Sequence, residues 1–177
     1  MTNGPASCKE KPGLETRPAN TFITSLPNRT PTMPAIVRNA TPTDTGAIFR
    51  MGSEEEVFGV SPRIRFYERQ ELDEWVASPQ DNLLLVLDCE GEVRGFLFCK
   101  LMSSHWAYLD NFYVHPAARG HGYGKLLIQA LLDLLRERKI AYLSTLVAEH
   151  DPYLSRYFES GGLAVEKTYW WLERFVE

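Results

Sequence analysis

The sequence predicts an α/β (α+β) fold with a mixed, mostly antiparallel central sheet that contains one parallel strand pair and is flanked by helices. The first observation is a meander of three β-compatible segments joined by short turns: Asn82 to Asp88, Val93 to Met102 and Trp106 to Val114. The second is a glycine-rich loop and an apolar-periodic helix that lead from Tyr108–Val114 to a further apolar segment, Ala141 to Val147. Because a helix crosses between these two strands, we expect them to run parallel.

Ahead of the meander, the sequence predicts one short strand and two helices. Ala35 to Arg38 forms the strand, and Thr41-Pro42-Thr43-Asp44 signals the start of the first helix. The second helix is expected over Pro62 to Val76, with candidate core positions at Phe66, Leu72, Trp75 and Val76. The acidic run Glu54-Glu55-Glu56 between the helices is expected to be a solvated face or loop rather than a metal site.

Turn residues separate the central elements. Glu90-Gly91-Glu92 is a hairpin turn, and Pro116 ends the third strand of the meander because proline cannot continue a central strand. The long helix spans Gly122 to Arg138 and carries three leucines on one face: Leu127, Leu131 and Leu134.

The C-terminal part is predicted to contain one helix and two strands. The helix begins at Asp151-Pro152, an N-cap residue followed by a proline, and ends at Gly161-Gly162. Two further segments, Leu163 to Lys167 and Thr168 to Phe175, are predicted to complete the sheet.

Length and composition indicate one compact domain preceded by a tail. With 177 residues, of which 44% are hydrophobic and 24% charged, the chain can bury a sizeable core. Residues 1–34 contain six prolines and show no sustained periodicity. We therefore expect a disordered tail over residues 1–34 and a folded domain over residues 35–177.

Charge and cysteine content disfavour several classes of ligand. A formal net charge of −4 disfavours a nucleic-acid partner, and Cys8, Cys89 and Cys99 lack metal-ligand spacing, so we expect neither nucleic acid nor a metal. No apolar run approaches membrane-spanning length and no signal-peptide pattern opens the chain. The expected location is the cytoplasm, without a membrane partner. The oligomeric state is not defined by the sequence, which is compatible with a homodimer.

The most informative segment is Arg119-Gly120-His121-Gly122-Tyr123-Gly124-Lys125, between the third meander strand and the long helix. Alternating glycines allow a sharp turn that exposes successive N–H groups at a helix start, where the helix dipole favours an anion. Lys125 in the first helical turn opposes that dipole unless a bound anion offsets it. The segment therefore predicts a pyrophosphate site, and the alternative is a turn with a purely structural role.

The residues around this segment resemble a known family. Val114-His115-Pro116, followed by Arg119, Gly122 and Gly124, is similar to the R/Q-x-x-G-x-G/A motif of the GNAT superfamily of acetyl-CoA-dependent N-acetyltransferases. The spacing differs from the glycine motifs of dinucleotide-binding and P-loop proteins. The resemblance covers about residues 35–177 and implies a GNAT-like fold.

The resemblance also implies acetyl-CoA as co-substrate, with its pyrophosphate on Gly120 to Lys125 and its pantetheine arm along the preceding strand. Pantetheine carries two amides, so it can pair with a strand edge through backbone hydrogen bonds. The implied cofactor-binding residues are Phe112, Tyr113, Val114, Arg119, Gly120, His121, Gly122, Tyr123, Gly124 and Lys125.

Asp110 is the candidate general base. The family often places a glutamate at this position, and the shorter aspartate here favours proton transfer through a water molecule. A solvated strand position beside the cleft would also explain this carboxylate. Glu149, His105 and His150 are alternatives, each expected to be structural or solvent-exposed.

Tyr157 is the candidate general acid, with an ambiguity of one residue. In many family members a tyrosine lies four residues before the glycine of a Gly-Phe pair. Counting from Gly162 places Phe158 at that position, whereas counting from Gly161 places Tyr157 there. A shift of one residue turns a helical side chain by about 100°, so the doubled glycine leaves both registers open.

These residues predict an N-acetyltransferase that moves an acetyl group to a primary amine by direct attack in a ternary complex. The alternative is a non-catalytic acyl-CoA-binding sensor, which would need the pyrophosphate site but no base or acid. Small amines, protein N-termini and lysine side chains all present the same nucleophile. Asp151-Pro152-Tyr153-Leu154 departs from the Asn-x-x-Ala that ribosomal-protein N-terminal acetyltransferases usually carry there.

Overall fold

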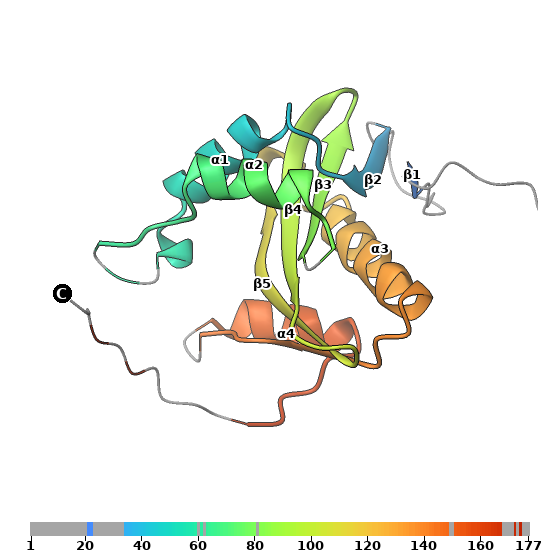
Figure 1. Cartoon of the computed structure of the whole chain (residues 1–177). Coiled ribbons are helices and arrows are strands. Elements are labelled where there is room, and N and C mark those ends of the chain that lie inside the picture. The colour runs from blue at the N-terminus through green and yellow to red at the C-terminus, as the bar shows by residue number, and fades with distance from the viewer. Residues whose placement is uncertain are drawn as a thin grey trace, which may run out of the picture.

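The computed structural model describes residues 21–22, 34–59, 61, 63–80, 82–148, 151–167, 172 and 174. A six-stranded sheet forms the centre of the molecule, with its strands in sequence order (Figure 1). The strands are β1 (Thr21–Phe22), β2 (Ala35–Asn39), β3 (Asn82–Cys89), β4 (Glu92–Leu101), β5 (Trp106–Val114) and β6 (Tyr142–Thr145). Every neighbouring pair is antiparallel except β5 and β6, which are parallel. The predicted mixed sheet with one parallel pair is confirmed.

Helices cover both faces of this sheet (Figure 1). Helices α1 (Thr45–Glu54) and α2 (Arg69–Ala77) lie on one face, with the short 3-10 turn η1 (Glu56–Phe58) between them in sequence. Helix α3 (Tyr123–Glu137) lies on the other face, where Phe158 of α4 (Pro152–Ser160) joins its core. Among the described residues no helix is long and apolar enough to cross a membrane.

The two faces of the sheet bury separate apolar clusters, because side chains alternate along each strand. On the α3 face, Leu127 and Leu131 are fully buried against sheet residues such as Leu97. On the α1 and α2 face, a cluster rich in aromatic rings packs Ile48 and Leu72 against Phe96. The core positions predicted for the long helix, Leu127, Leu131 and Leu134, are buried, and so is Leu72. The other candidate core residues, Phe66, Trp75 and Val76, are half-buried against the second cluster.

Helix α2 begins later than predicted, at Arg69 rather than Pro62. Glu68 is extended and forms a capping box with Glu71, in which the Glu68 N–H donates to Glu71 Oε2 over 2.8 Å. This reciprocal cap satisfies the first free amides and ends the irregular segment before it. Phe66 and Tyr67 consequently lie in a loop and pack against the sheet.

The strands at the two ends of the chain differ from the predicted ones. Leu163 to Lys167 forms no strand in the structure, and most of Thr168 to Phe175 lies outside the described residues. In the segment expected to be a disordered tail, β1 pairs Thr21 with Arg38 and Phe22 with Val37 of β2. The sheet therefore extends further toward the N-terminus than its sequence pattern indicates.

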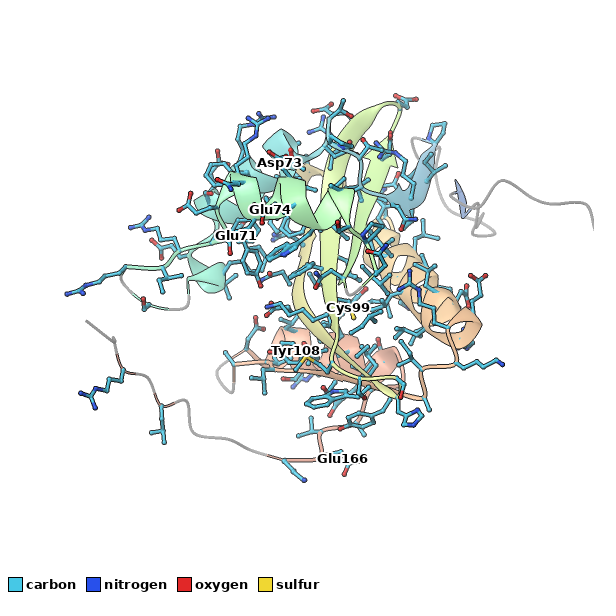
Figure 2. The ribbon with its side chains drawn as sticks, viewed as in Figure 1. Glu71, Asp73, Glu74, Cys99, Tyr108 and Glu166 are labelled. Atoms are coloured by element: carbon cyan, nitrogen blue, oxygen red, sulfur yellow. The ribbon has the colours of Figure 1, made fainter. Side chains whose placement is uncertain are left out.

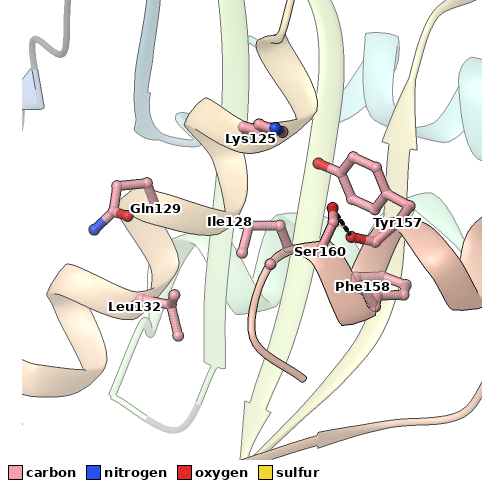
Figure 3. Close-up of a pocket in the computed structure, with 8 residues that line it drawn as sticks. Lys125, Ile128, Gln129, Leu132, Tyr157, Phe158 and Ser160 are labelled. Carbon is pink, nitrogen blue, oxygen red and sulfur yellow. Dashed lines mark hydrogen bonds between the residues drawn. The ribbon is translucent and has the colours of Figure 1, made fainter. Parts of the chain in front are cut away.

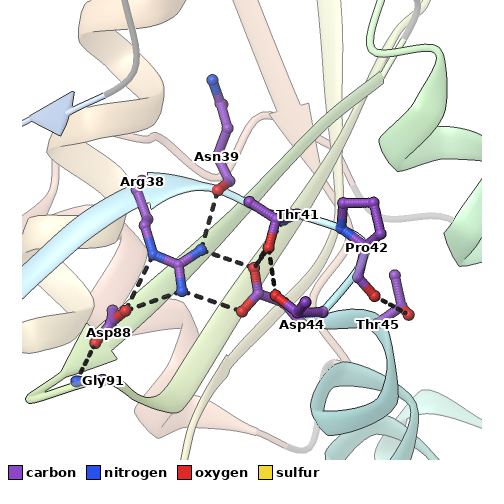
Figure 4. Close-up of polar contacts among 9 residues, drawn as sticks. Arg38, Asn39, Thr41, Pro42, Asp44, Thr45, Asp88 and Gly91 are labelled. Carbon is purple, nitrogen blue, oxygen red and sulfur yellow. Dashed lines mark hydrogen bonds and ion pairs between the residues drawn. The ribbon is translucent and has the colours of Figure 1, made fainter.

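A charged network ties β2, β3 and the start of α1 together (Figure 4). Arg38 Nη1 lies 2.7 Å from Asp44 Oδ2, and Arg38 Nη2 lies 2.9 Å from Asp88 Oδ2. The Thr41 N–H donates to Asp44 Oδ2 over 2.7 Å. Burial opposes ionisation of Asp44, but the hydrogen bonds from Arg38 and Thr41 outweigh it and hold the pKa of Asp44 below its ordinary value. This network fixes the start of α1 on the sheet.

Candidate active site

The candidate site begins at a free edge of β5. Only Trp106 to Leu109 pair with β6, because β6 ends at Thr145. From Asp110 to Val114, no described strand pairs with β5 on that side. Backbone N–H and C=O groups along an unpaired edge can accept an extended ligand that carries amides.

The glycine-rich segment follows this edge and leads into α3. Gly120 and Gly122 have φ values of +82° and +81°, and Gly122 is the left-handed N-cap of the helix. The Leu126 N–H donates to the Gly122 carbonyl over 3.3 Å. The N–H groups of Gly124 and Lys125 precede this bond, so they lie in the first helical turn, where no intrahelical carbonyl is available to them. Nothing lies within 4 Å of a Cβ placed on Gly120. The segment has the form of an anion-binding cradle.

Arg119 joins the cradle to β5. Its Nε donates to the Val114 carbonyl over 2.8 Å, and its guanidinium lies 5.8 Å from the centre of the Tyr113 ring. Burial and a hydrogen bond with Glu55 raise the pKa of Tyr113 to about 12. Tyr113 is therefore a neutral side chain on the α1 and α2 face, while its backbone belongs to the free edge.

Tyr157 lies over the first turn of α3. A Cβ on Gly124 would stand 2.5 Å from the Tyr157 hydroxyl oxygen and 3.1 Å from Phe112 Cζ. The Tyr157 ring stacks on Phe112 with 5.5 Å between the ring centres. Phe158 is 5% exposed and belongs to the core beneath α3. Of the two registers left open by the sequence, the structure brings Tyr157 to the cradle and directs Phe158 into the core.

A pocket of about 250 Å³ lies between α3 and α4 beside the cradle (Figure 3). Lys125, Ile128 and Gln129 line it from α3, and Tyr157 and Ser160 line it from α4. The lining combines apolar side chains such as Ile128 and Leu132 with the cationic side chain of Lys125, so the pocket can hold a mostly apolar group next to an anion.

Asp110 occupies an irregular position in β5. Phe98 pairs with Asn111 and Cys99 pairs with Leu109, so Asp110 is an extra residue without a partner in β4. A bulge of this kind re-aims side chains and is frequent beside active sites. Cross-strand partners share a face, so Asn111 lies on the same face as Phe98, toward α1 and α2. Asn111 Oδ1 is buried and accepts no hydrogen bond from any described residue.

Two side chains that the sequence did not predict at the site contact Asp110. Lys100 Nζ lies 2.6 Å from Asp110 Oδ2, and the Tyr67 hydroxyl donates a short hydrogen bond to the same oxygen. Lys100 Nζ also lies 3.3 Å from the Tyr67 hydroxyl. Tyr67 comes from the loop before α2 and Lys100 from β4, so no local spacing links either residue to Asp110. The available signal was a lysine that directly follows the uncharged run from Gly95 to Cys99.

Of the alternative bases, only His105 lies within the described residues, and it does not join this group. The backbone of His105, in the turn before β5, contacts Tyr142 at the end of the strand remote from the cradle. Glu149 and His150 lie outside the described residues. Asp110 is thus the carboxylate that the structure brings to the free edge of β5.

Comparison with known proteins agrees with this geometry. Residues 49–162 match the Acetyltransferase (GNAT) family. The chain belongs to that family, and acetyl transfer is the reaction that the family and its fold support. A search of curated proteins finds no match.

Three solved structures illustrate the fold. One is a PaiA N-acetyltransferase from Thermoplasma acidophilum in complex with coenzyme A, with a TM-score of 0.69, 19% identity, and coverage of 77% of this chain and 93% of that chain. A second is a transcriptional regulator from Bacillus halodurans C-125, with a TM-score of 0.67, 19% identity, and coverage of 79% and 99%. A third is an aminoglycoside acetyltransferase from an uncultured soil metagenomic sample in complex with sisomicin, with a TM-score of 0.65, 16% identity, and coverage of 81% and 97%.

Proposed function

We propose that this protein is an N-acetyltransferase that moves an acetyl group from acetyl-CoA to a primary amine by direct attack in a ternary complex. The observation that carries the proposal is the continuity of three features: the free edge of β5, the cradle at the start of α3, and the Tyr157 hydroxyl beside Gly124. A sensor needs only the first two. The tyrosine and the carboxylate of Asp110 supply the groups that proton transfer requires.

The residues present fit coenzyme A. The cradle from Gly120 to Lys125 would hold its pyrophosphate, since it contains the first-turn amides of Gly124 and Lys125 and carries the positive end of the α3 dipole. The edge from Asp110 to Val114 would pair with the pantetheine amides. Acetyl-CoA supplies a thioester carbonyl activated toward amines, and the backbone N–H groups near Tyr113 and Val114 would polarise that carbonyl.

The side chains then divide the proton transfers between them. Asp110 accepts the proton that the acceptor ammonium must lose before its nitrogen can attack, directly or through water. As the carbon–sulfur bond breaks, the Tyr157 hydroxyl gives its proton to the departing thiolate, and the second proton that the attacking nitrogen loses on forming the amide restores this hydroxyl, directly or through water. Holding both reactants in one cleft removes several kcal/mol of barrier, so this modest acid–base assistance suffices.

The test measures thiol release from acetyl-CoA across a panel of primary amines: polyamines, aminoglycosides, amino acids, and peptides with free N-termini or lysines. Acceleration by at least one amine, with the acetylated product identified by mass spectrometry, supports the proposal. Tight coenzyme A binding without release for any amine would replace it with the sensor.

The cradle is tested by two glycine variants with matched backbone geometry. Gly120 and Gly91 have φ values of +82° and +88°, and neither has an atom within 4 Å of an added Cβ. Gly120→Val and Gly91→Val therefore introduce similar strain. Calorimetry should show a loss of coenzyme A affinity of about tenfold or more in Gly120→Val, because the side chain blocks the approach of the phosphates, and wild-type affinity in Gly91→Val. Equal affinity in both variants would contradict the cradle.

A further inference from the structure

We infer that Lys100 and Tyr67 are positioning residues of Asp110, which occupy its Oδ2 atom, leave Oδ1 to receive the proton, and place a positive charge at a fixed position beside the carboxylate. This inference rests on the proposed function, because it assigns the supports of its base. It is carried by contacts among three side chains from β4, β5 and the loop before α2.

The two oxygens of Asp110 have different surroundings. Oδ2 receives the Lys100 ammonium at 2.6 Å and a short hydrogen bond from Tyr67. Among the described residues, no group donates to Oδ1. A carboxylate held by two donors on one oxygen presents the lone pairs of the other in a fixed direction. The Asp110 side chain keeps 20% of its surface exposed, so a proton can reach it.

Aromatic rings hold the Lys100 ammonium in place. Its Nζ lies 5.3 Å from the centre of the Tyr67 ring and 5.4 Å from that of Phe98. The Tyr67 ring in turn packs edge-on against Trp75 of α2, with 4.6 Å between ring centres. Contacts of a cation with ring faces restrict a flexible lysine side chain. Lys100 is therefore a charge at a defined position rather than a mobile surface group.

The other ionisable groups near this cluster do not compete with Lys100 for the position beside Asp110. Tyr108 of β5 and Cys99 of β4 interact electrostatically with Asp110, and Glu71 of α2 interacts with Tyr67. Figure 2 labels Tyr108, Cys99 and Glu71. Burial, and then the nearby Asp110, raise the pKa of Tyr108 and bring that of Cys99 to about 12, so both stay neutral near pH 7. Lys100 is the only cation that contacts Asp110 within the described part of the chain.

Tyr67 acts as a fixed donor. Burial, followed by the hydrogen bond to Asp110, raises the pKa of Tyr67 well above its ordinary value. Its hydroxyl therefore keeps its proton over the whole working pH range and donates it to Oδ2 throughout. The positive charge beside Asp110 is therefore that of Lys100, and Tyr67 adds a neutral donor.

The first experiment compares pH profiles of kcat/KM for the unmodified protein, Lys100→Met, Lys100→Arg and Lys139→Met. Lys139 is an exposed lysine beyond the far end of α3 and serves as the matched charge control. Without the neighbouring cation a carboxylate binds its proton more readily. Lys100→Met should move the acid limb to higher pH and lower kcat/KM about tenfold at the acid end, with acetyl-CoA affinity unchanged. Lys100→Arg keeps the positive charge, so its acid limb should lie at the same pH as that of the unmodified protein.

A second measurement does not depend on activity. In full-length protein labelled with ¹³C at aspartate carboxyl carbons, the Asp110 resonance, assigned with Asp110→Asn, is followed across pH. Its midpoint should rise in Lys100→Met and stay unchanged in Lys139→Met. An unchanged midpoint in Lys100→Met overturns the inference whether or not the protein transfers acetyl groups, whereas a shifted midpoint in a protein that accelerates no amine reaction would contradict the proposed function alone.

Tyr67→Phe separates the hydroxyl from the ring. The ring contacts with Trp75 and Phe98 remain, and only the donor to Oδ2 is lost. The kcat measured with saturating amine acceptor should fall about three- to tenfold, while the KM for acetyl-CoA is unchanged. This is expected when a base loses its fixed orientation. A normal kcat in a folded Tyr67→Phe protein would exclude a positioning role for Tyr67.

Discussion

The hydroxyl oxygen of Tyr157 stands 2.5 Å from the position that a Cβ would take on Gly124. Glycine at this point allows a tyrosine of α4 to reach the first turn of α3, where the amides of the cradle begin. The helix therefore needs a residue as small as glycine at position 124, because the Tyr157 side chain occupies the space that a larger residue would fill.

Gly124→Ala is predicted to disturb Tyr157. The added methyl group overlaps the hydroxyl, so the melting temperature and turnover should both fall. In a Tyr157→Phe background the overlapping oxygen is gone and the contacts of 3.1 Å to Phe112 Cζ and 3.2 Å to the ring carbon Cζ of residue 157 remain, so alanine should cost less there than in the unmodified protein. Thermal melts of the four proteins in this cycle give the coupling. Equal effects of Gly124→Ala in both backgrounds would contradict the contact.

Tyr157→Phe is predicted to lower turnover by roughly tenfold to a thousandfold, because it removes the donor to the departing thiolate. The ring stacking on Phe112 remains, so the affinity for acetyl-CoA should be nearly unchanged. Steady-state kinetics and calorimetry measure the two quantities. A fully active variant would remove Tyr157 from the mechanism.

Asp110→Asn is predicted to lower activity most at acidic pH, where less of the acceptor amine is already deprotonated. Raising the pH should partly restore the rate, since the free amine then needs no base. This recovery is measured by recording the pH profile of kcat/KM for both the variant and the unmodified protein. A uniform loss at every pH would indicate a structural role for the carboxylate.

Asp44→Asn is predicted to destabilise the fold by about 1–3 kcal/mol at pH 7, since it removes a charged hydrogen bond to Arg38. The folded state holds the pKa of Asp44 below its unfolded value, so the contribution is present above the unfolded pKa of about 4 and is lost as pH falls through the lower folded pKa. Urea melts at pH 7 and near pH 3 should therefore show the difference between variant and unmodified protein shrinking in acid.

Asp133→Asn is the control for that experiment. Its ion pair with Arg136 joins side chains that are 41% and 64% exposed. Exposed pairs contribute at most about 1 kcal/mol, so this variant should differ little from the unmodified protein. A loss as large as that of Asp44→Asn would show that burial is not the deciding factor.

Removal of the residues before Pro34 is predicted to leave coenzyme A affinity unchanged. The truncation deletes β1, which pairs only with β2 at one edge of the sheet. Four strand spacings, about 19 Å, separate β1 from β5. Calorimetry of the truncated protein checks the affinity, and a thermal melt reports what the two-residue strand contributes. Loss of cofactor binding would show that the N-terminal segment contacts the site.

Local sequence patterns were sufficient for most of the elements. Leucines at helical spacing, the turn at Glu90-Gly91 and the proline after β5 each act within a few residues, so α3, the hairpin and the end of β5 follow from them. The cradle is local in the same sense, because backbone conformation at Gly120 and Gly122 depends on the absence of a Cβ.

Only the tertiary structure decided which side chains meet. Tyr67 contacts Asp110 across 43 positions of the chain, and the bulge that re-aims Asp110 depends on its pairing with β4. The choice between Tyr157 and Phe158 depends on how α4 is rotated against α3, which a doubled glycine does not define. Backbone conformation responds to neighbouring residues, whereas a proton-transfer site depends on side-chain contacts between distant segments, and those are set when the two faces of the sheet are packed.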